Sequence, residues 1–281
     1  MQNEAQEYAA LSAEEDTEET QEIRVTVSIS KDGKFLDDKS GNPMAGREIT
    51  LSGQSSYTMD DALKAAHDLY YPGGSEDGYD YHADEEGIFS GVIYKLWGWD
   101  RDNVPFIRYS LNRDSSLYGA ALSQKILDGD EMHFYIQQRN GVDSLAFFTQ
   151  TEQTILQGEN VTLHLKQKSD SGSRASDCAG ASIYVDGVKK EGLTTDEQGY
   201  VTIEGLEPRE TPYFITAEKL EQDSSGNMAT LITAAYTYIS VSVSEAQKSN
   251  YLKKVTLHMA VDEKEQDVSL TCLDGSQPFI I

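Results

Sequence analysis

The stretch from Gly180 to Pro208 reads GASIYVDGVKKEGLTTDEQGYVTIEGLEP, and it contains two short β-strand patterns separated by turn formers. Apolar residues alternate with polar ones in two runs, at Ile183 and Val185 and again at Val201 and Ile203. A period of two places one side of a strand in a core and leaves the other side polar. The Asp-Gly pair after the first run and the TTDEQG segment before the second predict the turns.

Similar patterns recur on both sides of this stretch, at intervals of roughly 10–15 residues. They lie at 147–148, 161–165, 213–217 and 231–243. Several short strands with turn signals between them are typical of an antiparallel sandwich. We therefore expect an Ig-like β-sandwich over residues 143–243.

The same stretch carries a family resemblance. A Thr-Asp-x-x-Gly-x-Val pattern followed by a Leu-x-Pro turn occurs at Thr195, Asp196, Gly199, Val201, Leu206 and Pro208. It resembles the immunoglobulin-like and collagen-adhesin B-type repeats of Gram-positive surface proteins. Some relatives form a Lys–Asn isopeptide cross-link with help from a Glu. Lys166 or Lys168 and Glu218 lie in suitable strands, but the final strand over 231–239 has no Asn, so we do not expect the cross-link.

An α+β pattern precedes the sandwich, over residues 21–140. Apolar residues alternate from Ile23 to Ile29, and 47–51 is a plausible second strand. A cap-like Thr58 then begins a helix whose apolar residues recur at helical spacing up to Leu69. Further strands are expected at 88–96, 106–111 and 132–137, which predicts one helix packed on one sheet.

This first domain resembles the domain of unknown function shared with the C-terminal lobe of transcobalamin. The residues that carry the resemblance are an ALKAA helix, the YSLN segment that ends at Asn112, and the LDGDEMHFY segment from Leu127 to Tyr135. The resemblance implies a β-grasp-like fold. Arg113 stands where the family usually has Gly, and the loop over 72–87 is long.

The two ends of the chain differ from its centre. Residues 1–20 are acidic and contain no basic residue, which predicts a disordered leader. Residues 244–281 contain one good strand pattern from Val255 to Val261, so we expect a C-terminal β segment. This segment either begins a truncated third domain or packs on the sandwich as an extension.

Charge excludes several classes of function. The chain has 48 acidic and 23 basic residues in 281, a net charge of −25, which disfavours a nucleic-acid partner and an anionic membrane surface. No apolar run approaches the ~20 residues of a membrane span. The two cysteines, Cys178 and Cys272, could form a disulfide, with unpaired thiols as the alternative.

Catalytic motifs are missing from the sequence, so we expect no enzyme. The chain has no Gly-x-Ser-x-Gly elbow, no Gly-rich phosphate loop and no His-Glu-x-x-His pattern. His133, His164 and His258 occupy positions of alternating strands that we expect to face solvent.

An acidic and aromatic segment between Tyr70 and Asp102 provides the candidate site. Its aromatic rings and carboxylates could line a pocket for a sugar or planar ligand, or hold calcium through oxygen ligands. The candidate ligand-binding residues are Tyr79, Tyr81, Trp97, Trp99 and Asn112, and the candidate calcium ligands are Asp100 and Asp102. A solvated loop is the alternative, and we expect no other cofactor.

These features together favour a non-catalytic, modular protein of a bacterial surface, secreted or attached to the cell wall. Its partner would be an extracellular protein or glycan. Two alternatives remain: binding of a corrinoid-type ligand by the first domain, and a carbohydrate-active enzyme.

Overall fold

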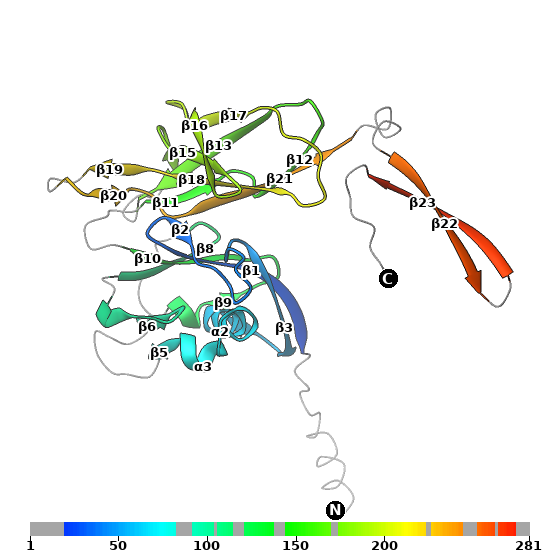
Figure 1. Cartoon of the computed structure of the whole chain (residues 1–281). Coiled ribbons are helices and arrows are strands. Elements are labelled where there is room, and N and C mark those ends of the chain that lie inside the picture. Colours follow the sequence, from blue (N-terminus) through cyan, green and yellow to red (C-terminus); the bar gives the residue numbers. More distant parts are fainter. Residues whose placement is uncertain are drawn as a thin grey trace, which may run out of the picture. The chain divides into compact units, whose positions relative to one another are not determined.

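The computed structural model describes residues 20–82, 92–103, 106–114, 121–137, 144–169, 174–222, 226–243, 252–261 and 264–273, the last two as backbone only (Figure 1). The predicted acidic leader, apart from Thr20, and the acidic residues 84–86 lie outside these ranges. The chain is a mostly β, multidomain protein, as predicted. Within the described residues, no helix is long and apolar enough to cross a membrane.

The chain divides into two compact units. The first comprises Met1–Phe147, Gln167–Ser176 and Glu218–Ala235, and the second comprises Phe148–Lys166, Asp177–Ala217 and Tyr236–Ile281. The predicted domain boundary near residue 140 remains a prediction.

A mixed sheet and one helix form the centre of the first unit. The strands are β1 (Gln21–Lys31), β2 (Lys34–Phe35), β3 (Arg47–Gln54), β8 (Phe106–Leu111) and β10 (Glu131–Gln137). β1 runs parallel to β10, β8 borders β10, and β2 and β3 share the other edge of β1. A central parallel pair flanked by antiparallel strands, with a helix on the sheet, is a β-grasp-like arrangement, which the sequence pattern predicted as α+β and the resemblance implied as β-grasp-like.

The helix α2 (Met59–Tyr70) begins where predicted, because Thr58 and Asp61 form a capping box. Its buried residues, Met59, Ala62, Leu63, Ala66 and His67, pack in the core beneath the sheet. Leu69, which the pattern placed on the apolar face, is 49% exposed.

Two small sheets and a short helix also belong to the first unit. They are α3 (Gly74–Gly78), β4 (Tyr57–Thr58) with β9 (Lys125–Ile126), and β5 (Asp80–His82) with β6 (Val92–Leu96) and β7 (Trp99–Asp100). Two 3-10 turns, η1 (Arg101–Asn103) and η2 (Ala121–Ser123), lie between the strands.

The prediction that His133 faces solvent is wrong. β10 is a central strand, and every residue from Met132 to Gln137 is buried, so both of its faces are covered. Opposite it, Ser28 and Ser30 of β1 are buried as well, although alternation predicted them on a polar face. His164 is half-buried, and the side chain of His258 lies outside the description.

Strands between Leu145 and Ser242 form a two-sheet sandwich (Figure 1). One sheet contains β11 (Leu145–Phe148), β13 (Val161–Lys168), β14 (Ser176–Asp177) and β17 (Tyr200–Ile203). The other has the order β12 (Glu152–Leu156), β21 (Ala235–Ser242), β18 (Tyr213–Glu218), β15 (Ser182–Val185) and β16 (Val188–Thr194). Alternate residues of these strands, such as Leu163, Ile215 and Ile239, are fully buried between the sheets.

The sandwich is Ig-like, but one pair of strands is parallel where the sequence predicted antiparallel pairing throughout. The chain leaves the sheet of β11 after Phe148 and joins the opposite sheet as β12, where it runs parallel to β21. The strand patterns in the sequence did not predict β12, β16 or the hairpin of β19 (Leu220–Gln222) and β20 (Met228–Thr230). The predicted C-terminal strand is one half of a hairpin of β22 (Leu252–Val261) and β23 (Lys264–Leu273).

Candidate functional site

The Thr-Asp-x-x-Gly motif forms the turn that leads into β17, one of the strands beside a groove at the edge of the sandwich. The buried hydroxyl of Thr195 donates to the carbonyl of Cys178 at 2.6 Å and accepts from the N–H of Ala181 at 2.9 Å. One carboxylate oxygen of Asp196 accepts the N–H groups of residues 198 and 200. Gly199 has φ +76°, and a Cβ there would lie 2.5 Å from the carbonyl oxygen of Leu165. The motif therefore holds the start of β17 against its neighbours.

The second turn, Asp186-Gly187, joins β15 to β16. Both residues have positive φ, +52° and +76°, as a two-residue hairpin of this type requires. The guanidinium of Arg209 donates to both carboxylate oxygens of Asp186, at 2.7 and 2.8 Å. These hydrogen bonds hold the pKa of Asp186 below its usual value. Arg209 also lies 3.5 Å from the ring centre of Tyr213. These contacts hold the turn between β15 and β16 in place.

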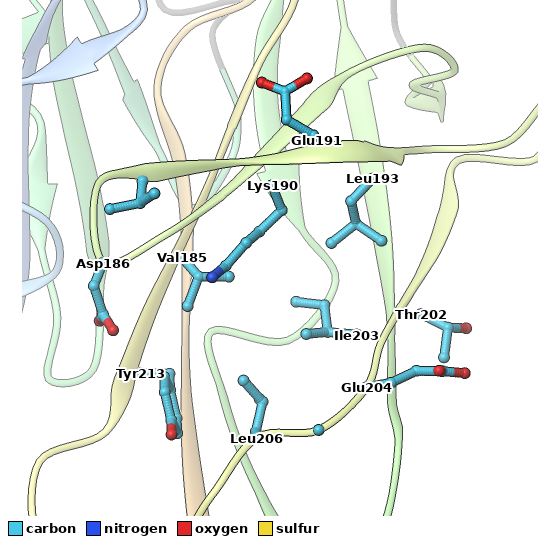
Figure 2. A pocket seen from close by; sticks show the side chains of 12 residues that line it. Val185, Asp186, Lys190, Glu191, Leu193, Thr202, Ile203, Glu204, Leu206 and Tyr213 are labelled. Atoms are coloured by element: carbon cyan, nitrogen blue, oxygen red, sulfur yellow. The ribbon is translucent and has the colours of Figure 1, made fainter.

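Beside the Asp186-Gly187 turn, between β16 and the end of β17, lies a hollow of about 670 Å³, which we call the edge groove (Figure 2). Its apolar part consists of Val185, Ile203 and Leu206, which are buried, together with Leu193. Figure 2 shows Leu193 and Lys190 directed into the hollow and Glu191 directed away from it. The remaining lining residues are Asp186, Val188, Thr202, Glu204, Gly205 and Tyr213.

Two strand edges border the edge groove. Among the described residues, β16 pairs only with β15, and β17 pairs only with β13. β16 also bulges away from β15 between its pairs at Lys189 and Thr194. Both strands therefore present backbone N–H and C=O groups that no neighbouring strand uses, and such an edge can pair with another chain.

The structure brings Tyr79 and Trp97 together, but in the core. Their exposed fractions are 8% and 6%, and both rings lie around the imidazole of His67, at centroid distances of 5.2 and 4.8 Å. The hydroxyl of Tyr79 donates to Asp60 at 2.6 Å. The indole N–H of Trp97 donates to the carbonyl of Asp37 at 2.9 Å. Both rings therefore stabilise the first unit from within.

His67 holds this cluster together and was not singled out in the sequence. Its Nδ1 lies 2.8 Å from the carbonyl oxygen of Leu63, which can only accept, and its Nε2 lies 3.1 Å from the N–H of Trp97, which can only donate. The ring is therefore neutral with its proton on Nδ1. Burial lowers its pKa to about 4.

The other candidate residues lie apart from this cluster. Tyr81 is half-buried against the core, and Trp99 is 41% exposed with the ammonium of Lys31 at 4.5 Å from its ring. Asn112 has φ +50° and occupies a separate turn, where its amide bonds Asp130 at 2.7 Å.

The candidate calcium ligands and cysteines can be placed as follows. Asp100 ends β7 at 3.8 Å from the amine of Lys95, and Asp102 is exposed in η1. In the described ranges, no group of three His, Cys, Asp or Glu side chains could hold a metal ion. Cys178 is buried, and Cys272 belongs to β23, whose side chains are not described.

Ser30 and His133 form a second feature that sequence reasoning missed. The hydroxyl of Ser30 and Nε2 of His133 are 2.8 Å apart, and both residues are buried. Burial lowers the pKa of His133 to about 3. A serine beside a histidine can act as a nucleophile and its base, but this pair lies in the interior, away from solvent. No motif in the sequence signals the pair, because the two residues are 103 positions apart.

Comparison with known proteins gives limited results. No protein-family model matches the chain, and no curated protein matches it. The solved structures that align with it include the fibronectin(III)-like modules of Clostridium thermocellum CbhA, with TM-score 0.26 and 9% identity over 79% of this chain and 95% of that one. Domains 4 and 5 of the S-layer protein SbsC align with TM-score 0.24 and 12% identity, over 79% and 97% of the two chains. These scores are too low to establish a relationship.

Proposed function

We propose that this chain is a non-catalytic, modular binding protein of a bacterial surface, and that its sandwich takes up an extended polypeptide in the edge groove. The observation that carries the proposal is the pair of open strand edges, β16 and β17, on either side of an apolar floor. An incoming strand can extend either ladder through its backbone, while every second side chain fills the floor.

The floor and its one inward-directed cation define the partner. Val185, Ile203 and Leu206 favour apolar side chains at alternate positions of the bound segment. Lys190 points into the hollow, close enough to Asp186 to help lower the pKa of that carboxyl, although Arg209 has the larger effect. An acidic side chain or a carboxyl terminus on the partner would complete the pairing with Lys190.

The remaining features support a surface protein rather than an enzyme. The chain is built from successive β-rich parts, a β-grasp sheet and a sandwich, and it is strongly acidic. The serine–histidine pair that the structure shows, Ser30 with His133, is buried. From the Thr195–Pro208 motif we infer that the sandwich is related to the adhesin-like repeats of Gram-positive bacteria. We infer from the same motif that the protein is extracellular or associated with the cell wall.

Selection from a displayed library of short linear peptides tests the proposal. Enriched sequences should alternate apolar residues and contain one acidic position. Lys190→Glu should weaken their binding by at least about tenfold, or 1.4 kcal/mol. Lys189→Glu is the matched control, because this lysine is the neighbour of Lys190 on β16 and does not line the groove. Equal losses in the two variants, or no enrichment, would contradict the proposal.

The resemblance to the transcobalamin lobe supports a second candidate, a corrinoid-type ligand on the β-grasp sheet. The parallel pairing of β1 and β10 agrees with the fold that the resemblance implies. Calorimetry with cobalamin tests this candidate, and the absence of heat at millimolar ligand would exclude it.

A further inference from the structure

The outer face of the sandwich contains a second hollow, where β12 lies beside β21. The register pairs Glu152 with Tyr238 and Thr154 with Ser240. Residues directly opposite each other in a ladder lie on the same face, and Ile239 between them is fully buried in the core. These four residues therefore belong to the face that points away from the core.

This hollow measures about 310 Å³, and it is lined by Glu152, Gln153, Thr154, Pro212, Tyr238 and Ser240. The carboxylate of Glu152 and the hydroxyls of Thr154 and Ser240 form no hydrogen bond or ion pair with any part of the chain that the structure describes. Three unused polar groups therefore surround one concave surface. They supply both acceptors and donors within the hollow.

The aromatic wall of the hollow is held in a fixed orientation. The ring of Tyr238 packs against Phe214 at 5.3 Å between centroids, and against Tyr236 at 5.6 Å with an interplanar angle of 63°. Side chains locked by neighbouring rings lose little freedom when a ligand arrives. Tyr238 can therefore serve as a preformed stacking surface.

We propose that this hollow binds a neutral pyranose unit of a glycan, at a site separate from the edge groove. A pyranose has one face of C–H groups, which packs on an aromatic ring, and a rim of hydroxyls that donate and accept hydrogen bonds. Tyr238 supplies the ring, Glu152 accepts from ligand hydroxyls, and Thr154 and Ser240 can do either. A ligand without hydroxyls would leave these polar groups without partners.

Charge and size narrow the ligand further. Glu152 and the overall net charge of −25 repel a carboxylated or sulfated sugar. The volume is at the small end of the roughly 300–1,000 Å³ typical of ligand sites, which suits one or two sugar rings. With so few polar contacts, we expect a dissociation constant in the millimolar range.

Saturation-transfer NMR on the full chain, with a panel of methyl pyranosides as probes, tests the site. Neutral glycosides should receive saturation, and the matching uronates should bind at least several-fold more weakly. Tyr238→Ala should weaken binding by about tenfold or more, whereas Tyr238→Phe, which keeps the ring, should remain within about twofold of the original chain.

Two further variants serve as controls for misfolding and for non-specific binding. Thr154→Arg fills the hollow from its exposed edge and leaves the ring in place, so it should also abolish binding. Tyr200→Ala removes a tyrosine that is 43% exposed on the other sheet, and it should bind sugar normally. The proposal is overturned if no glycoside in the panel binds, if Thr154→Arg binds as well as the original chain, or if uronates bind as tightly as neutral sugars.

Discussion

The surroundings of His67 in the folded chain favour the neutral form of its imidazole. The hydrogen bond that Nε2 accepts from the N–H of Trp97 requires the neutral ring, whereas the bond from Nδ1 to the carbonyl of Leu63 is compatible with either form. The aromatic rings around His67 shield it from water. A second proton would place an N–H opposite the N–H of Trp97. The folded state therefore disfavours the charged form of His67, and burial has the same effect on His133.

We predict that the chain loses stability as the pH falls from 6.5 towards 4. In this window the unfolded histidines take up protons, whereas folded His67, with its pKa of about 4, does not, so protons favour unfolding. The lowered pKa of His67 alone should reduce the free energy of unfolding by about 3 kcal/mol across this pH window. Urea unfolding at pH 7 and at pH 4.5 measures the difference.

His67→Gln is the control for this prediction, because the amide does not titrate. The variant should be less stable at pH 7, but the dependence of its stability on pH should be weaker. An equal slope in both chains would show that the acid sensitivity comes from other groups.

At the scale of elements, turns and caps explain which parts of the fold could be read from the sequence. The Thr58–Asp61 capping box and the Asp186-Gly187 hairpin turn act within a few residues, so local pattern predicted α2 and β15 correctly. β16 has no alternating pattern, because Lys189, Lys190 and Glu191 follow one another along a bulged edge strand. Its edge position, which creates the groove, depends on contacts distant in sequence.

The same reasoning explains the outcome at the candidate site. Aromatic residues near carboxylates look alike in a binding loop and in a core. Tyr79 and Trp97 are buried because both rings pack against His67, which lies on α2. The outer hollow is formed by residues from strands far apart in the chain, such as Glu152 and Tyr238, so no local motif signals it. The edge groove lies within residues 185–213, but the sequence pattern does not show that β16 and β17 have open edges.

We predict that Gly199→Ala destabilises the sandwich more than Gly158→Ala does. Both glycines have positive φ, so each substitution carries a backbone cost of about 1 kcal/mol. A Cβ at Gly199 also meets the carbonyl of Leu165 at 2.5 Å, whereas nothing lies within 4 Å at Gly158. Gly199→Ala should therefore cost about 2 kcal/mol or more beyond the control, measured by chemical unfolding. Similar losses in both variants would show that the turn can move.

At the scale of the whole molecule, charge is the dominant feature. The net charge of −25 at pH 7 means that folding brings many like charges together. Ion pairs such as Arg47 with Asp38, at 2.9 Å, and Lys64 with Asp60, at 2.7 Å, offset this only locally. The repulsion acts over distances that added salt shortens.

We predict that the melting temperature at pH 7 rises as sodium chloride increases from about 10 to 150 mM, over which the screening length falls from roughly 30 to 8 Å. Scanning fluorimetry measures the change. Near the isoelectric point of about 4.4, the same addition of salt should have a much smaller effect. A melting temperature that falls with salt at pH 7 would contradict the prediction.

Both β-rich parts share one feature of strand order that bears on a chain pulled by its ends. In the β-grasp sheet the first strand, β1, lies parallel to β10 over six residue pairs, and in the sandwich β12 lies parallel to β21 over five. Tension along the chain therefore loads each set of backbone hydrogen bonds in shear, all at once, instead of opening them one after another. Such a connection resists traction far better than a hairpin whose hydrogen bonds open one at a time.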